Sequence, residues 1–226
     1  MNFSPSDFDP IAFQNAPRLR IKPMYFELGF SDRPEMYARR GVWDRIIKAL
    51  DHLPSEYGFV IWDVYRPRHV QAKLFEWMRG EIRKKYPHLS ETERFDLARK
   101  YMSPPSRVGE DYCPPHLSGG AIDLTLFDVI TENECDMGTP FDDCTERAHS
   151  DHFERAGELS ADEQTIRDRR RALSSAMTVA GFVPYQYEWW HYDFGNIFWS
   201  RITHQPAVFG PLFGDGEWPE NKTTGA

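Results

Sequence analysis

The segment GFVIWDVYR at residues 58–66 constrains the fold more than any other part of this 226-residue chain. It is rich in β-branched and aromatic residues and ends at Pro67, which is the pattern of a buried strand. After Pro67, apolar residues recur at helical spacing: Val70, Leu74, Trp77, Met78 and Ile82. The segment therefore predicts a buried strand that leads into a helix.

Further helices are expected from apolar spacing and from capping signals. Residues 34–53 predict an amphipathic helix, with Ser31 or Asp32 as its cap and Pro34 near its first turn. Its apolar positions are Val42, Ile46, Leu50 and Leu53.

Two stretches have the pattern of a capping box, SETE from residue 90 and SADE from residue 160. They predict helices near residues 91–102 and 161–180, the second of which stops at Gly181. The remaining strand candidates are AIDLTLF and YQYEWWHYDF, and residues 128–160 are expected to be mostly loop. These elements indicate a mixed α+β protein.

The composition is that of one globular domain. With 40% hydrophobic and 15% aromatic residues, the chain can form one large core or two small ones. We expect a single domain over residues 1–226, with about 1–20 and 215–226 as peripheral extensions. The formal charge of −8 argues against nucleic-acid binding, which requires clustered Lys and Arg. The basic run RDRRRA at residues 167–172 is interpreted as the solvated face of a helix.

Cysteine usage and hydropathy point to a cytoplasmic protein. The three cysteines, Cys113, Cys135 and Cys144, are odd in number and lack the spacing of a structural zinc site, so we expect reduced thiols. The sequence has no apolar segment long enough for a bilayer, and its start lacks the basic end and apolar run of a signal peptide. We expect no membrane partner, and the sequence leaves the oligomeric state open.

The stretch CPPHLSGGAIDLTL places His116 and Asp123 at the two ends of a glycine hinge. One interpretation is packing, with a hydrogen-bonded buried histidine and an aspartate that caps a turn. The other is that both side chains bind one metal ion, which then requires a third ligand elsewhere.

The stretch YEWWHYDF offers that third ligand, because Glu188 and His191 lie three residues apart among aromatic side chains. A straight strand would direct them to opposite faces, so the strand is expected to be distorted there. A catalytic zinc ion uses three protein ligands and one open position, and His116, Asp123 and His191 would form such a set. Glu188, with a pKa raised by its apolar surroundings, would be the general base and acid. The alternative is that each histidine is an ordinary core residue.

Four motifs together resemble the zinc D-alanyl-D-alanine dipeptidases of the vancomycin-resistance (VanX-like) type. HLSGGAID matches their H-x-x-G-x-A-x-D signature and EWWH their E-x-x-H signature; YRP and DMGTPFD follow the same order along the chain. The resemblance covers about half of the chain. It implies a hedgehog-like D,D-peptidase zinc fold, with a mainly antiparallel sheet packed by helices, and one Zn2+ per chain.

Carried over to this sequence, the resemblance gives His116, Asp123 and His191 as zinc ligands and Glu188 as the catalytic base and acid. It implies that Arg66 stabilises the oxyanion, for which the alternative is a surface ion pair with Asp63 or Glu76.

The resemblance also makes Asp142 the partner of the substrate amine, for which the alternative is a loop cap formed by Asp142 or Asp143. Tyr25 is a candidate for the pocket wall, although the sequence around it fits the family pattern poorly. The family serine that contacts the substrate carboxylate is replaced by Pro114, which has no donor.

The expected activity is zinc-dependent hydrolysis of a short D-amino-acid dipeptide, with D-alanyl-D-alanine as the leading candidate. The alternatives are a related zinc D,D-carboxypeptidase or L,D-peptidase and a noncatalytic zinc-stabilised binding module. Other candidate residues have simpler interpretations: His149 and His152 are expected to be exposed in a polar loop, and Ser118 lacks the surroundings of a nucleophile.

Overall fold

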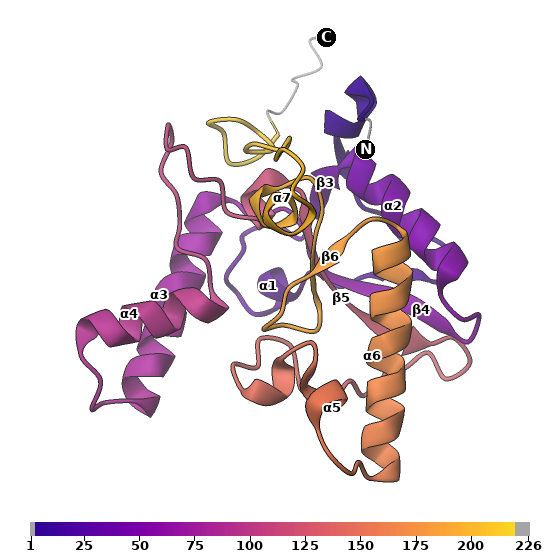
Figure 1. Cartoon of the computed structure of the whole chain (residues 1–226). Coiled ribbons are helices and arrows are strands. Elements are labelled where there is room, and N and C mark those ends of the chain that lie inside the picture. The colour runs from indigo at the N-terminus through magenta and orange to yellow at the C-terminus, as the bar shows by residue number, and fades with distance from the viewer. Residues whose placement is uncertain (1–2, 220–226) are drawn as a thin grey trace.

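The computed structural model describes residues 3–219, which form a small two-stranded sheet and a larger mixed sheet of five strands, with helices packed around the larger sheet (Figure 1). The sheet order is β2-β4-β5-β7-β6, and only the β2–β4 pair is parallel. The strands are β2 (Leu19–Ile21), β4 (Tyr57–Asp63), β5 (Ala121–Asp128), β7 (His191–Asp193) and β6 (Val183–Pro184). The expected α+β class with a mainly antiparallel sheet is confirmed.

The helices form two groups on different sides of the sheet (Figure 1). One group consists of α2 (Arg40–His52) and α6 (Ala161–Val179), which contact each other, and the other of α3 (Arg68–Lys85) and α4 (Glu91–Tyr101). The short helices are η1 (Pro5–Phe8), α1 (Met24–Glu27), η2 (His116–Ser118), η3 (Glu146–Ala148), α5 (His152–Arg155) and α7 (Ile197–Thr203). None of the helices within residues 3–219 has the length and apolar character needed to span a membrane.

The alternation of side chains along β5 separates the core from the polar site. Leu124 and Leu126 are fully buried in the main hydrophobic core together with Ile46 of α2 and Leu173 of α6. Asp123 lies between Ile122 and Leu124, which both belong to this core, so its side chain leaves the opposite face of the sheet. The strand thus supplies core residues on one face and a buried carboxylate on the other.

The predicted capping boxes at the starts of α4 and α6 are confirmed. The backbone nitrogen of Ser90 donates to Glu93 at 2.8 Å and the Ser90 hydroxyl accepts from the Glu93 nitrogen at 3.3 Å. Ser160 and Glu163 make the same pair of contacts. Helix α6 ends at Val179. Gly181 follows with φ of +102°, a backbone conformation that favours glycine.

The prediction of a helix over residues 34–53 is wrong at its start. Residues Tyr37–Arg39 form β3, which pairs with β1 (Pro10–Ala12), and α2 begins only at Arg40. The cause is Arg39, whose buried guanidinium donates to the carbonyl oxygens of Ser118, Phe8 and Gly210 and thereby holds this segment extended. Long-range contacts of one arginine outweigh the local capping signals.

The two ends of the described chain contribute apolar contacts to the molecule. Phe13 and Leu19 are buried in the main core, and Trp218 packs edge-on against Tyr65 at 5.8 Å between ring centroids. The single-domain division itself stays a prediction, and residues 220–226 of the expected second extension lie outside the described residues.

Candidate active site

The glycine hinge of the HLSGGAID stretch brings His116 and Asp123 together. His116 starts the short helix η2, and Gly119 leaves it with φ of +67°, a conformation that side-chain-bearing residues rarely adopt. A Cβ atom on Gly120 would collide with the carbonyl oxygen of Phe194, so this position also requires glycine. The chain then enters β5, and Asp123 faces back toward His116.

The prediction of a strand over the whole YQYEWWHYDF stretch is wrong for its first part. Only His191–Asp193 belong to β7, and residues 185–190 form a turn after β6. The Ser150 hydroxyl donates to the Tyr185 carbonyl at 2.5 Å, and the Trp189 nitrogen donates to the Ala148 carbonyl at 3.0 Å, so the preceding loop holds the turn. This turn places Glu188 and His191 on the same side, as the site requires.

Three strands carry the centre of the site in one cross-strand row. Asp123 of β5 pairs with Asp63 of β4 on one side and with His191 of β7 on the other. Directly paired residues of neighbouring strands face the same way, about 5 Å apart. The row therefore brings the side chains of Asp63, Asp123 and His191 to one place.

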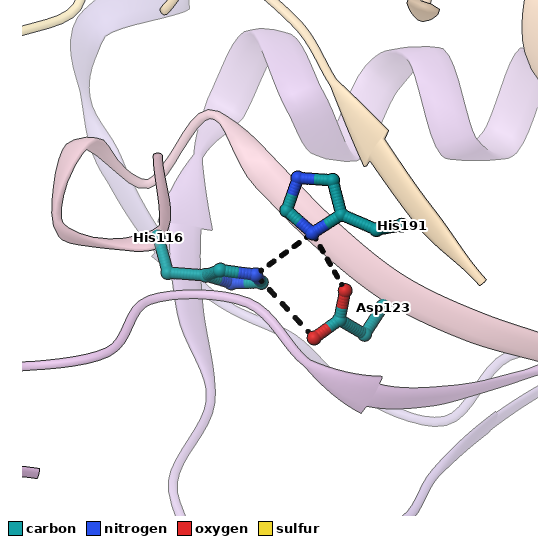
Figure 2. Close-up of side chains that lie close together, drawn as sticks. All are labelled: His116, Asp123 and His191. Carbon is teal, nitrogen blue, oxygen red and sulfur yellow. Dashed lines mark hydrogen bonds and ion pairs between the residues drawn. The ribbon is translucent and has the colours of Figure 1, made fainter. Parts of the chain in front are cut away.

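His116, Asp123 and His191 form a cluster with the geometry of a metal site (Figure 2). The Nε2 atom of His116 lies 3.2 Å from Nδ1 of His191 and 3.3 Å from Oδ2 of Asp123, and Nδ1 of His191 lies 3.0 Å from Oδ1 of Asp123. Atoms bound to one tetrahedral zinc ion at its usual ligand distances are roughly 3.3–3.6 Å apart. The spacing and the donor types of these side chains fit a zinc ion.

Hydrogen-bond partners behind the cluster orient His116. Its Nδ1 atom lies 2.6 Å from the carbonyl oxygen of Val64 and 3.1 Å from Oδ2 of Asp63. A carbonyl can only accept, so Nδ1 carries the proton and Nε2 offers its lone pair to a metal. Burial acts to raise the pKa of Asp123, but the neighbouring His116 and His191 outweigh burial and hold that pKa below its usual range.

Glu188 lies at the edge of the cluster, with Oε2 3.9 Å from Nδ1 of His191. Its side chain is 14% exposed, and burial raises its pKa to about 8, with the carboxylates of Asp123 and Asp142 adding to the effect. The raised pKa expected from the sequence is confirmed. A carboxyl group of this kind can both hold and release a proton near neutral pH.

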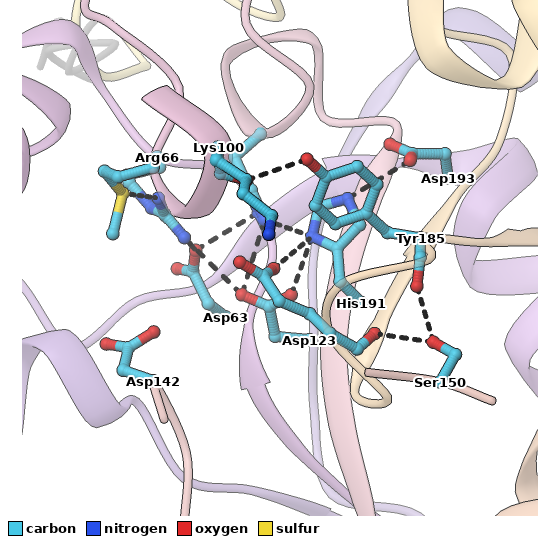
Figure 3. Close-up of polar contacts among 12 residues, drawn as sticks. Asp63, Arg66, Lys100, Asp123, Asp142, Ser150, Tyr185, His191 and Asp193 are labelled. Atoms are coloured by element: carbon cyan, nitrogen blue, oxygen red, sulfur yellow. Dashed lines mark hydrogen bonds and ion pairs between the residues drawn. The ribbon is translucent and has the colours of Figure 1, made fainter. Parts of the chain in front are cut away.

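Arg66 is buried beside the cluster (Figure 3). Its guanidinium donates to Oδ2 of Asp63 at 2.9 and 2.7 Å, and Nη2 lies 3.4 Å from Oδ2 of Asp123. The alternative of an exposed ion pair is excluded, since Arg66 is 5% exposed and its pair with Asp63 is internal. The Nη1 atom also donates to Oε1 of Gln71 at 3.0 Å, which fixes the direction of the guanidinium.

Asp142 and Tyr25 form a second polar pair in the same cavity. The Tyr25 hydroxyl is 3.1 Å from each carboxylate oxygen of Asp142, and the guanidinium of Arg66 lies over the Tyr25 ring at 4.5 Å. Burial raises the pKa of Asp142 to about 7, and the Asp123 carboxylate adds to this shift. The loop-capping role belongs to Asp143, whose Oδ1 accepts from the Thr145 nitrogen at 2.8 Å.

One cavity is lined by the three clustered side chains and their neighbours: His116, Asp123, His191, Glu188, Arg66, Asp142 and Tyr25. Sequence reasoning missed several of its other residues, because none of them lies in a recognisable motif: Gln71, Arg99, Lys100, Ser103, Tyr185 and Phe198. Asp63 was considered only as a surface partner of Arg66. Tyr185 donates to the Lys100 carbonyl at 2.9 Å and so joins the turn before β7 to the end of α4.

Two residues near the site differ from expectation or from the family pattern. His149 is 8% exposed, because its ring packs edge-on against Tyr187 at 5.1 Å, so the prediction that it is exposed is wrong. Pro114 provides only its carbonyl oxygen, which accepts from the Ser118 nitrogen at 3.3 Å. Neither residue belongs to the metal-type cluster found within residues 3–219.

Comparison with known proteins identifies the family. The model of the M15 peptidases, described as D-ala-D-ala dipeptidase, matches residues 43–205. The chain is 33% identical over 155 residues to a D-alanyl-D-alanine dipeptidase of Enterococcus faecium, which covers 66% of this chain and 68% of that protein. It is 34% identical over 142 residues to that of Enterococcus faecalis (60% and 61%), and 26% identical over 214 residues to that of Synechocystis (87% and 85%). The chain therefore belongs to the M15 family of metallopeptidases.

Proposed function

We propose that this protein is a zinc-dependent dipeptidase that hydrolyses D-alanyl-D-alanine to two molecules of D-alanine. The observation that carries the proposal is the convergence of His116, Asp123 and His191, with Glu188 beside them. The choice of D-alanyl-D-alanine as the substrate is supported by the names of the family and of the relatives described above. The cytoplasmic location stays a prediction.

The metal site and the base would divide the hydrolytic chemistry. A zinc ion held by His116, Asp123 and His191 would supply Lewis acidity to a water molecule and to the scissile carbonyl. Glu188 would take a proton from the attacking water and deliver it to the departing amine, so that one carboxyl group acts first as base and then as acid.

Two further groups would hold and stabilise the substrate. Arg66, permanently charged and fixed by Asp63 and Gln71, would donate to the carbonyl oxygen as negative charge develops on it. Asp142 would bind the free ammonium group of the dipeptide, with Tyr25 holding the carboxylate in place. An enclosed carboxylate at this position favours substrates with an unblocked amino terminus.

An assay of released D-alanine tests this function directly. The zinc-loaded protein should hydrolyse D-alanyl-D-alanine, lose activity with a chelator, and regain it when zinc is added. N-acetyl-D-alanyl-D-alanine is the matched control, because it keeps the scissile bond but lacks the ammonium group. Efficient cleavage of the acetylated compound would favour a carboxypeptidase, and zinc binding without any product would contradict catalysis altogether.

A further inference from the structure

Two buried polar residues, Asp193 and Asn196, lie behind His191, on the side away from His116 and Asp123. Nε2 of His191 is 3.2 Å from Oδ2 of Asp193, and Oδ1 of Asp193 accepts from the side-chain amide of Asn196 at 2.6 Å. Figure 3 shows Asp193 beside His191 and opposite Asp123. The His191 ring therefore lies between two carboxylates, one toward the cavity and one behind it.

Asp193 and Asn196 are both almost completely inaccessible to solvent. Asp193 is 1% exposed and Asn196 is fully buried. A buried carboxylate is unfavourable unless charged or hydrogen-bonding partners compensate for the lost water. Here His191 and Asn196 each face one of the two Asp193 oxygens, so the position of the carboxylate is specified from both sides.

Asn196 is itself fixed by the start of α7. Its side-chain oxygen accepts from the backbone nitrogens of Phe198 and Trp199, both at 3.0 Å, which is the role of a helix N-cap. Its amide nitrogen donates to Asp193. Gly195, with φ of +66°, makes the turn that brings the helix start back to the strand.

We propose that Asp193 and Asn196 are positioning residues that hold the His191 imidazole with Nδ1 directed at the metal. The Asp193 carboxylate, 3.2 Å from Nε2, favours a proton on that nitrogen and therefore the tautomer whose Nδ1 lone pair faces His116 and Asp123. Asn196 holds the Asp193 carboxylate in position by donating to its other oxygen, Oδ1. Removal of the residues that orient a metal-binding histidine commonly weakens metal affinity by about 10- to 100-fold.

Asp193 and Asn196 also connect His191 to the wall of the cavity. Phe198, in the first turn of α7, lines the cavity and packs against Tyr185 at 5.7 Å between ring centroids. Asn196 therefore contacts both the group that orients His191 and the helix that carries a wall residue. Displacement of the α7 start would alter the metal ligand and the substrate cavity together.

Zinc affinity is the measurement that tests this inference, which rests on the metal site of the proposed function. The full-length protein is stripped of metal and titrated with zinc in competition with a chromophoric chelator. Asp193→Asn keeps the shape but removes the charge, and we expect zinc to bind about 10-fold or more weakly. Asn196→Ser keeps a good helix cap but loses the donor to Asp193, and we expect a smaller loss, on the order of threefold.

Ser160→Ala is the matched control, because it removes a helix cap far along the chain from the metal ligands. It should lower the melting temperature of the metal-free protein by about 2–4 °C and leave zinc affinity unchanged. Wild-type zinc affinity in both Asp193→Asn and Asn196→Ser would overturn the inference. Failure of the wild-type protein to bind zinc would instead overturn the metal site itself.

Discussion

The two sides of the active-site cavity are constructed in different ways. The metal side is a row of paired residues on neighbouring strands, Asp63, Asp123 and His191, whose spacing follows from the hydrogen-bonded ladder. On the substrate side, Tyr25 of α1 meets the loop at Asp142, segments that are far apart along the chain. In the proposed function, the sheet would determine where the chemistry takes place, and the packing of loops and helices would determine which substrates enter the cavity.

This difference predicts that changes on the metal side reduce turnover, whereas changes on the substrate side mainly weaken binding. Arg66 belongs to both sides, because it contacts Asp63 and Asp123 and also covers the Tyr25 ring. Substitutions in the two regions can therefore separate kcat from KM.

The largest effect is expected for Glu188→Gln. The amide cannot take a proton from water, so kcat should fall by roughly 10²–10⁴-fold. Zinc content should stay at the wild-type level, because Glu188 is not one of the three clustered ligands. Kinetics combined with metal analysis checks both points, and undiminished turnover would remove Glu188 from the mechanism.

A somewhat smaller effect is expected for Arg66→Ala. Loss of a charged donor to the developing oxyanion should lower kcat by roughly 10²–10³-fold. It also leaves the buried Asp63 carboxylate without its cation, so Arg66→Lys is the control that keeps the charge. A variant that lost only substrate affinity, with kcat intact, would assign Arg66 to the substrate side alone.

Asp142→Asn should act mainly on KM. Removal of the carboxylate weakens a charge-assisted contact with the substrate ammonium, and an increase in KM of roughly 10-fold or more is expected. Asp143→Asn is a neighbouring control, because Asp143 caps its own loop and does not line this cavity. Equal KM values for both variants and the wild type would contradict amine binding at Asp142.

The smallest effect concerns stability and pH. Burial raises the pKa of Asp142 to about 7, so the folded protein binds more protons than the unfolded chain between about pH 4 and pH 7. The free energy of unfolding of the metal-free protein should therefore decrease as pH rises through this window. Asp142→Asn should reduce that decrease by at least about 1 kcal/mol.

Denaturant unfolding of metal-free wild type and Asp142→Asn at pH 5 and pH 8 measures the effect. The variant should be the more stable protein at pH 8, and its advantage over wild type should be clearly smaller at pH 5. An identical pH dependence in the two proteins would mean that Asp142 ionises normally.

The sequence predicted the local elements well where capping and periodicity agreed. Helices α3, α4 and α6 and strand β5 lie where expected, and the glycine hinge before β5 does bring His116 close to Asp123. The misplaced elements, β3 and the turn before β7, are held by long-range contacts of Arg39 and of Ser150. Such contacts leave no periodic signal in the sequence.

The partners of the site residues were harder to predict than the residues themselves. Asp63 could be recognised as important only from the strand register that sets it beside Asp123, and register is not visible in a single strand. Tyr185 and Gln71 likewise reach the cavity through packing alone. Motifs identify the groups that take part in the chemistry, while the residues that orient them depend on the completed fold.

The position of His191 has a consequence for how the protein is made. During synthesis His116 and Asp123 leave the ribosome long before β7, and the metal-type cluster requires all three side chains. A nascent chain that ends before residue 191 cannot form this cluster, so loading of the proposed metal would have to wait until β7 has been synthesised.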